Sequence, residues 1–399
     1  MATPTPDEPA PNGHRSDVIV VGLGVVGLVA AWRAARSGRT VTVLDPAAGA
    51  GASHAAAGML APVSETEFGE DDVLAINLAS TRAWPTFAAE LERASGHEVA
   101  FTRTGSLQVA FDADDARELD RVVALQRSHG LDVTTLDAAG ARRAEPLLGP
   151  RVAAAAHSPS DHQVDPRRVT EALLAALVAE GVTVLRRGVR RLVTDAPGRV
   201  AGLTDDDGQE HRAGTVVVAA GTATPALLDD LPDVVAPIRS VKGQILRLDA
   251  TELPWLAGER IVRGLVQGRR VYVVGRADGE VVVGATTEER SDQVVTAGGV
   301  FALLRDARAL VPGLDEAPLV EQTARLRPAT PDHLPLLGPT VRDGLVLAAG
   351  HHRHGILQLA ATSEAFDDLW AGREVAAHWR PADARRFPST RPEAVRESA

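Results

Sequence analysis

The chain has 399 residues, a formal net charge of −11 and no cysteine. Its length suits two domains, or one domain interleaved with another, and the negative charge disfavours nucleic acid and anionic membranes, which attract basic surfaces. The absence of cysteine excludes disulfides, thiolate metal sites and cysteine nucleophiles. These properties favour a small-molecule partner.

The ends of the chain differ from its body. Residues 1–15 and 381–399 are polar and interrupted by proline, and we expect both to be flexible tails. The longest apolar stretch, residues 18–31, is too short to span a membrane. The segment before it is acidic where a secretory signal has a basic region. We therefore expect a cytoplasmic protein without a membrane partner.

The first predicted elements form a βαβ unit. Residues 18–21 are a continuous β-branched run, residues 25–37 are an Ala-rich helix that ends at Gly38, and residues 40–44 are a second buried strand. Two buried strands joined by a helix predict a parallel sheet.

A later helix has clear signals at both ends. Asp165 is expected to cap it, Pro166 takes its first position, and Gly181 follows its end. The face expected to be buried contains Leu173, Leu174, Leu177 and Val178. Strands are predicted at residues 182–185 and 216–220.

From residue 239 onward the pattern changes to strands joined by short turns. Strands are predicted at residues 244–248, 271–274, 281–283 and 319–327, with a helix at 300–311. Residues 344–348 return to the pattern of a buried parallel strand. We predict an α/β protein in which a discontinuous Rossmann-like nucleotide-binding domain joins a mostly antiparallel α+β substrate domain. The first would comprise residues 16–95, 160–236 and 335–380, and the second residues 96–159 and 237–334.

The turn after the first strand reads Gly22-Leu23-Gly24-Val25-Val26-Gly27, and Asp45 follows at the end of the next strand. A lone glycine-rich turn is weak evidence, but this one follows a strand, opens a helix and precedes an acid about 20 residues on. Gly22 permits the turn, Gly24 admits a pyrophosphate, and Gly27 allows the helix to approach the sheet. The pattern predicts a dinucleotide and does not decide between NAD and FAD.

Six further motifs make the chain resemble the D-amino-acid oxidase superfamily, and within it the glycine oxidases of thiazole biosynthesis. They are Ala-Ala-Gly-Met-Leu at 56–60, Asp-Pro at 165–166, Val-Lys-Gly-Gln at 241–244, Val-Gly-Ala-Thr at 283–286, Leu-Arg-Pro at 326–328, and the turn at 349–357. The resemblance implies FAD as the cofactor and makes the Rossmann-like domain an FAD-binding domain.

The resemblance also implies which residues line FAD. Besides the glycine turn they are Val25, Val26, Asp45, Pro46, Ala52, Ser53, Ala57, Gly58, Met59, Val189, His351, His352, Arg353, His354, Gly355, Ile356 and Leu357. A helix that begins near Gly355 would direct its first amides at the flavin edge that becomes anionic on reduction. His354 and Gln358 depart from the usual residues of this turn. His54 is one residue out of register with the histidine to which some amine dehydrogenases link their flavin, so we expect non-covalent FAD.

Two side chains are predicted to hold the substrate. The resemblance places Arg327 and Tyr272, the only tyrosine, against the substrate carboxylate. A guanidinium can bind that group with two parallel hydrogen bonds. Arg353 is expected over the flavin near the substrate, and the only lysine, Lys242, either lies beside the flavin or forms a structural salt bridge. No metal is expected at the turn 351–354, because adjacent histidines rarely converge on one ion.

The resemblance implies oxidation of glycine or another small amine to the imine, then to glyoxylate and ammonia, while O2 is reduced to H2O2. Thiamine thiazole synthesis would use the product. Alternatives are a sarcosine or D-amino-acid oxidase, a dehydrogenase with another electron acceptor, or a flavin-binding protein without turnover. Similar enzymes are commonly homo-oligomers.

Overall fold

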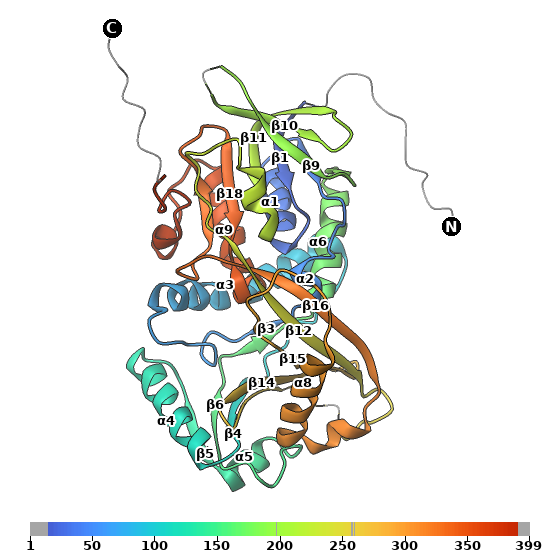
Figure 1. Cartoon of the computed structure of the whole chain (residues 1–399), viewed down its shortest axis with the longest axis vertical. Helices are drawn as coiled ribbons and strands as arrows, with labels where there is room; N and C mark the ends of the chain where they lie inside the picture. Colours follow the sequence, from blue (N-terminus) through green and yellow to red (C-terminus); the bar gives the residue numbers. More distant parts are fainter. Residues whose placement is uncertain (1–14, 197, 257, 259, 390–399) are drawn as a thin grey trace.

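The computed structural model describes residues 15–389 except positions 197, 257 and 259. This part of the chain forms two eight-stranded sheets and one two-stranded sheet. The two large sheets lie toward opposite ends of the long axis, the first at the top and the second at the bottom of Figure 1. The predicted flexibility of residues 1–14 and 390–399 lies outside the described residues.

The first sheet has the order β17-β18-β11-β1-β2-β8, and its pairings from β18 to β8 are parallel. The antiparallel pair β9 and β10 extends from β11. The strands are β1 (Arg15–Val21), β2 (Val41–Leu44), β8 (Thr183–Leu185), β9 (Val189–Thr194), β10 (Val200–Asp205), β11 (Glu210–Val218), β17 (Leu336–Pro339) and β18 (Leu345–Ala349).

Helices cover one face of this sheet. They are α1 (Val25–Arg36), α3 (Asp71–Ser95), α6 (Pro166–Ala179) and α9 (Leu359–Trp370). Along β1, Val18 and Val20 pack against these helices, whereas Ile19 and Val21 belong to the cluster on the other face. A strand buried on both faces needs apolar side chains at every position, which explains the continuous β-branched run.

The start of α6 agrees with its predicted signals. The Asp165 carboxylate accepts hydrogen bonds from the backbone N–H groups of Arg167 and Arg168 at 2.8 and 3.4 Å. One expectation about its buried face is wrong, because Val178 is 75% exposed. Val178 lies in the last turn of α6, which ends at Ala179, and at this position most of its side chain is open to solvent.

The second sheet has the order β16-β12-β15-β14-β13-β4-β6-β5 and is antiparallel except between β13 and β4. Its strands are β4 (Ser106–Ala110), β5 (Thr134–Asp137), β6 (Ala154–Ser158), β12 (Arg239–Asp249), β13 (Ile261–Val266), β14 (Arg269–Gly275), β15 (Glu280–Gly284) and β16 (Leu319–Ala329). One face packs on α5 (Ala138–Ala144) and α8 (Ala297–Leu310). The other face packs on residues 55–61 of the first half of the molecule.

The predicted fold class is therefore confirmed, while the domain boundaries stay predictions. The remaining elements are α2 (Ala52–Ala55), β3 (Met59–Leu60), α4 (Ala113–Ser128), β7 (His162–Gln163) and α7 (Thr224–Leu227), with 3-10 helices at Gly221–Ala223, Pro312–Glu316, His352–His354 and Ala377–Ala382. No helix in the described ranges is long and apolar enough to cross a membrane.

The C-terminal tail predicted from residue 381 begins too early. Ala382 and Ala384 are buried, and the Arg386 guanidinium forms an ion pair with Asp332 at 2.8 Å. Small alanines let this proline-containing segment pack against the body of the molecule, although its composition resembles that of a linker. Residues 381–389 are therefore part of the folded structure.

Candidate active site

A cavity of about 1120 Å³ lies between the first sheet and the second. The glycine turn and the residues after β2 line one end, and strands β12, β13, β14 and β16 line the other. The turn after β18 forms part of the wall between them. The cavity thus connects the end predicted to bind a nucleotide with the end predicted to bind a substrate.

Close backbone contacts explain two glycines of the turn. Gly22 has a φ of +103°, and a Cβ there would lie 2.5 Å from the Ala219 carbonyl oxygen. A Cβ at Gly27 would lie 1.9 Å from the Gly22 carbonyl oxygen. Gly24 immediately precedes α1 and lines the cavity. The turn therefore brings the N-terminus of α1 to the cavity, where amide N–H groups can bind a phosphate.

Two polar side chains stand beside that helix end. Asp45 accepts hydrogen bonds from the N–H groups of Leu23 at 2.6 Å and Ala47 at 2.7 Å. Ser53 Oγ accepts one from the Val25 N–H at 3.2 Å. Both residues line the cavity, and the Asp45 carboxylate can also accept from ribose hydroxyls.

Most of the predicted cofactor residues come together around this cavity. Those that line it are Gly22, Gly24, Val25, Val26, Asp45, Pro46, Ala52, Ser53, Ala57, Gly58, Met59, Val189, His351, His352, Arg353, Gly355 and Ile356. Gly27, His354 and Leu357 are not among the lining residues. The helix N-terminus, the carboxylate of Asp45 and the tiny side chains of residues 55–58 suit a dinucleotide with a flat ring.

The turn after β18 differs from its prediction. The regular helix α9 begins at Leu359, four residues later than expected, and His352–His354 form a 3-10 turn. The His354 ring is buried away from the cavity lining, with Nδ1 3.2 Å from a Glu65 carboxylate oxygen. The Gln358 side chain donates a hydrogen bond to Asn77 at 2.9 Å. The two residues that depart from the family pattern therefore have structural contacts: His354 with the loop before α3, and Gln358 with α3 itself.

Burial keeps His351 and His352 neutral at ordinary pH. It lowers the pKa of His351 to about 3, and burial together with the nearby Arg353 charge lowers the pKa of His352 to about 2. Burial also lowers the pKa of His354, although its bond to Glu65 opposes this shift. No cluster of three metal-ligating side chains occurs among residues 15–389 as described.

These shifts predict how stability depends on pH. Each neutral histidine binds a proton on unfolding once the pH falls below the ordinary pKa of 6.5. The free energy of unfolding should therefore decrease below pH 6.5, by up to about 1.4 kcal/mol per pH unit for each histidine. Urea unfolding at pH 7.5, 6.5 and 5.5 measures this slope. His351→Asn should make the slope shallower, and an unchanged slope would contradict the assignment.

Tyr272 and Arg327 line the end of the cavity that is predicted to bind the substrate. A Cβ at Gly284 would lie 2.3 Å from the Tyr272 hydroxyl oxygen, and one at Gly243 would lie 2.3 Å from an Arg327 Nη. The two side chains therefore lie flat over glycines of neighbouring strands. Arg327 Nη1 donates to the Thr286 carbonyl oxygen at 3.1 Å. Burial raises the pKa of Tyr272 and lowers that of Arg327, so the hydroxyl stays protonated at neutral pH.

Sequence reasoning missed two charged residues of this wall. Arg263 pairs with Tyr272 across β13 and β14, and its guanidinium lies 2.5 Å from a Glu65 carboxylate oxygen. Although burial raises the pKa of Glu65, Arg263 and His354 outweigh it and hold this pKa far below its usual range. Glu65 lies in a loop without periodicity, and no signal in the sequence identifies its partners.

Two other predicted cations have acidic partners. Arg353 lines the cavity, and its guanidinium also donates to Glu70 at 2.7 Å. Lys242 is fully buried outside the cavity lining, and its Nζ lies 2.8 Å from Asp292 and 3.6 Å from Glu288. This geometry favours the structural alternative for Lys242.

We expect Lys242→Met to lower the melting temperature, because it leaves Asp292 and Glu288 without their shared cation. The substrate kinetics of the folded holoenzyme should stay unchanged. Thermal unfolding and steady-state assays on the same preparation measure both properties. A fall in kcat at an unchanged melting temperature would instead place Lys242 in the reaction.

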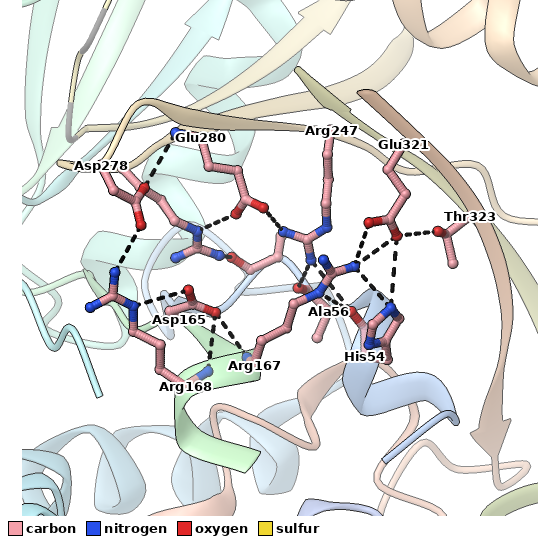
Figure 2. Close-up of polar contacts among 12 residues, drawn as sticks. His54, Ala56, Asp165, Arg167, Arg168, Arg247, Asp278, Glu280, Glu321 and Thr323 are labelled. Atoms are coloured by element: carbon pink, nitrogen blue, oxygen red, sulfur yellow. Dashed lines mark hydrogen bonds and ion pairs between the residues drawn. The ribbon is translucent and has the colours of Figure 1, made fainter. Parts of the chain in front are cut away.

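His54, the residue considered for a covalent flavin link, is directed away from the cavity. Its Nε2 lies 3.0 Å from an Arg167 nitrogen and 3.8 Å from Glu321 (Figure 2). Its neighbours Ser53 and Ala55 line the cavity, and the imidazole does not. This orientation supports the prediction of non-covalent attachment.

Comparisons with known proteins agree with this geometry. The family model described as DAO, FAD dependent oxidoreductase, matches residues 17–369. Glycine oxidase from Geobacillus kaustophilus is 32% identical over 94% of this chain and 97% of its own length. A crystal structure titled as glycine oxidase of the same organism superposes with a TM-score of 0.86 at 30% identity, over 94% of this chain and 99% of that one.

A longer relative is the bifunctional protein ThiO/ThiG of Synechocystis sp. It is 32% identical over 94% of this chain, which spans only 54% of that protein's length. The match of one family model to most of the chain, together with the full-length relatives, settles the class of protein. The chain belongs to the DAO family of FAD-dependent oxidoreductases, and FAD is its cofactor.

Proposed function

We propose that this enzyme oxidises the C–N bond of glycine or another small amine. Glycine, O2 and water would give glyoxylate, ammonia and H2O2, through an imine that water hydrolyses. The imine or its product would serve the synthesis of the thiazole moiety of thiamine. The observation that carries this proposal is that Arg327 and Tyr272 both line the cavity, where each lies over a glycine.

The substrate carboxylate would be held by these two residues. The Arg327 guanidinium offers two parallel donors, and the Tyr272 hydroxyl remains a donor because burial raises its pKa. Binding of the carboxylate at two points also fixes the orientation of the Cα–H bond. This orientation is how such a site raises the reaction rate. FAD, when bound, supplies the redox chemistry as a hydride acceptor.

Charge around the site also favours a substrate that carries a carboxylate. Arg263 is paired with Glu65, and Arg353 with Glu70, which leaves Arg327 without a carboxylate within 4 Å among the described residues. A substrate carboxylate would therefore be the natural counter-ion of Arg327. No general base is needed for hydride transfer from a neutral amine.

Anaerobic mixing of the yellow holoenzyme with glycine, sarcosine and D-alanine tests the proposal. Glycine should bleach the flavin, and admission of air should restore its colour with formation of H2O2. Bleaching by sarcosine or D-alanine alone would assign another amine, and slow reoxidation by air would indicate a dehydrogenase. Failure of all three amines to bleach the flavin would overturn amine oxidation.

A further inference from the structure

A cluster of ion pairs joins the second sheet to the segment at residues 54–58 (Figure 2). At its centre Glu280 bridges two buried arginines. Arg247 Nη1 lies 2.6 Å from one Glu280 oxygen and Arg276 Nε lies 2.7 Å from the other. Arg247 is 1% exposed and Arg276 is 6% exposed. Burial of two guanidinium groups is costly unless they are paired and hydrogen-bonded.

Both arginines also donate hydrogen bonds to backbone carbonyls. Arg247 Nη2 donates to the Ala56 carbonyl oxygen at 3.3 Å, and Arg276 Nη2 donates to that of Ala57 at 2.9 Å. Arg276 Nη1 also donates to the Val164 carbonyl oxygen at 2.8 Å. Two successive peptide groups are thus fixed from the side of the second sheet.

These hydrogen bonds to the carbonyl groups determine the direction of the N–H groups of the same peptides. The C=O and N–H of a trans peptide point in opposite directions. With the carbonyls of Ala56 and Ala57 turned to the arginines, the N–H groups of Ala57 and Gly58 are turned away from them. Both residues line the cavity, and neither N–H has a hydrogen-bond partner among the residues that the structure describes.

Gly58 shows why such a segment needs to be held. Its φ is +83°, and a Cβ there would lie 2.0 Å from the Val164 carbonyl oxygen. A glycine with this freedom adopts a fixed conformation only when its surroundings determine it. Arg276 binds the carbonyl of Ala57, which precedes Gly58, and the carbonyl of Val164, which faces Gly58. It therefore holds the two segments that pack together at Gly58.

From these contacts we propose that Arg247, Glu280 and Arg276 are positioning residues for the flavin. They hold the Ala57 and Gly58 N–H groups toward the cavity as donors to the bound cofactor. Donors fixed in place stabilise the electron-rich reduced form more than the oxidised form. The role assigned to the cluster depends on FAD and not on which amine is oxidised.

The experiment compares Glu280→Gln and Arg276→Lys with two matched controls. Asp278→Asn removes a partner of Arg168 in the more exposed part of the same cluster. Asp306→Asn removes a buried carboxylate that pairs with Arg269 at 2.9 Å, away from the cavity lining. Each protein is purified with FAD, and the FAD dissociation constant, the flavin midpoint potential and the melting temperature are measured without any amine.

Glu280→Gln and Arg276→Lys should weaken FAD binding by about tenfold or more, the loss expected for one hydrogen bond to a charged group. Their midpoint potentials should become more negative. Asp278→Asn should change neither property, and Asp306→Asn should lower only the melting temperature. Where Glu280→Gln does not fold, Arg276→Lys and Arg247→Lys keep the charge and decide the question.

Wild-type FAD affinity and potential in the folded arginine variants would overturn the proposal. An equal shift in Asp306→Asn would overturn it as well, because loss of stability alone would then explain the effect. If a variant of Glu280, Arg276 or Arg247 has a shifted midpoint potential but its flavin is still bleached by glycine, the positioning role is supported independently of the substrate assignment.

Discussion

Arg327→Ala should lower kcat/KM for the amine substrate by between about 30-fold and several thousand-fold while FAD stays bound. The range corresponds to the ~2–5 kcal/mol lost when one partner of a buried charge pair is removed. The side chain lies over Gly243, and within residues 15–389 as described its one hydrogen bond goes to the Thr286 carbonyl oxygen. Removing it should therefore affect the substrate carboxylate more than the fold.

Arg327→Lys separates charge from geometry. One ammonium supplies a positive charge but cannot reproduce two parallel hydrogen bonds, so this variant should also be poor. Steady-state kinetics and the flavin absorbance of each variant are the measurements. Arg373→Ala, which removes an exposed partner of Asp368 beyond the end of α9, serves as the control. Unchanged kinetics in Arg327→Ala would remove this residue from the substrate site.

Local patterns in the sequence were enough for the βαβ unit and for α6 in the nucleotide-binding half of the fold, whereas α3, β9, β10 and β17 were not assigned. The β-branched run in β1, the helix opened by the glycine turn and the capping Asp165 each act within a few residues. Such signals do not depend on the rest of the chain. The parallel neighbours of β1, by contrast, come from residues 41–44 and 212–218, and the crossover rule alone supports only the first of these.

The substrate half was predicted less completely. Strands β4, β5, β6 and β13 were not assigned, and β13 pairs with β4 in parallel across about 150 positions of sequence. A short apolar run says nothing about such a distant partner. Arg263 illustrates the consequence, because its importance comes from Tyr272 beside it and Glu65 opposite it, both of which require the three-dimensional structure.

Charged residues show the same limit. The sequence allows Lys242 either a place beside the flavin or a structural salt bridge. Only its contacts with Asp292 and Glu288 in the folded chain favour the salt bridge. The departure at His354 was visible in the sequence, while its partner Glu65 lies 289 positions earlier. A substitution in a motif can thus be seen from sequence, but the contact that it makes depends on the fold.

Gly27→Ala should remove FAD binding, because the added methyl group would lie 1.9 Å from the Gly22 carbonyl oxygen and 3.3 Å from Ala219 Cβ. Neither the turn nor the strand behind it can yield without moving α1 away from β1. Such overpacking costs about 1–3 kcal/mol of stability. It also displaces the helix N-terminus that would bind the pyrophosphate.

Gly298→Ala is the matched control, since a Cβ at this position in α8 meets no atom within 4 Å. This variant should keep its FAD and gain up to about 1 kcal/mol, because alanine in a helix loses less conformational entropy than glycine. Flavin content after gel filtration and urea unfolding measure both effects. Full FAD occupancy in Gly27→Ala would show that helix α1 can shift without loss of the phosphate site, and the close approach of helix to strand would then have no part in binding the cofactor.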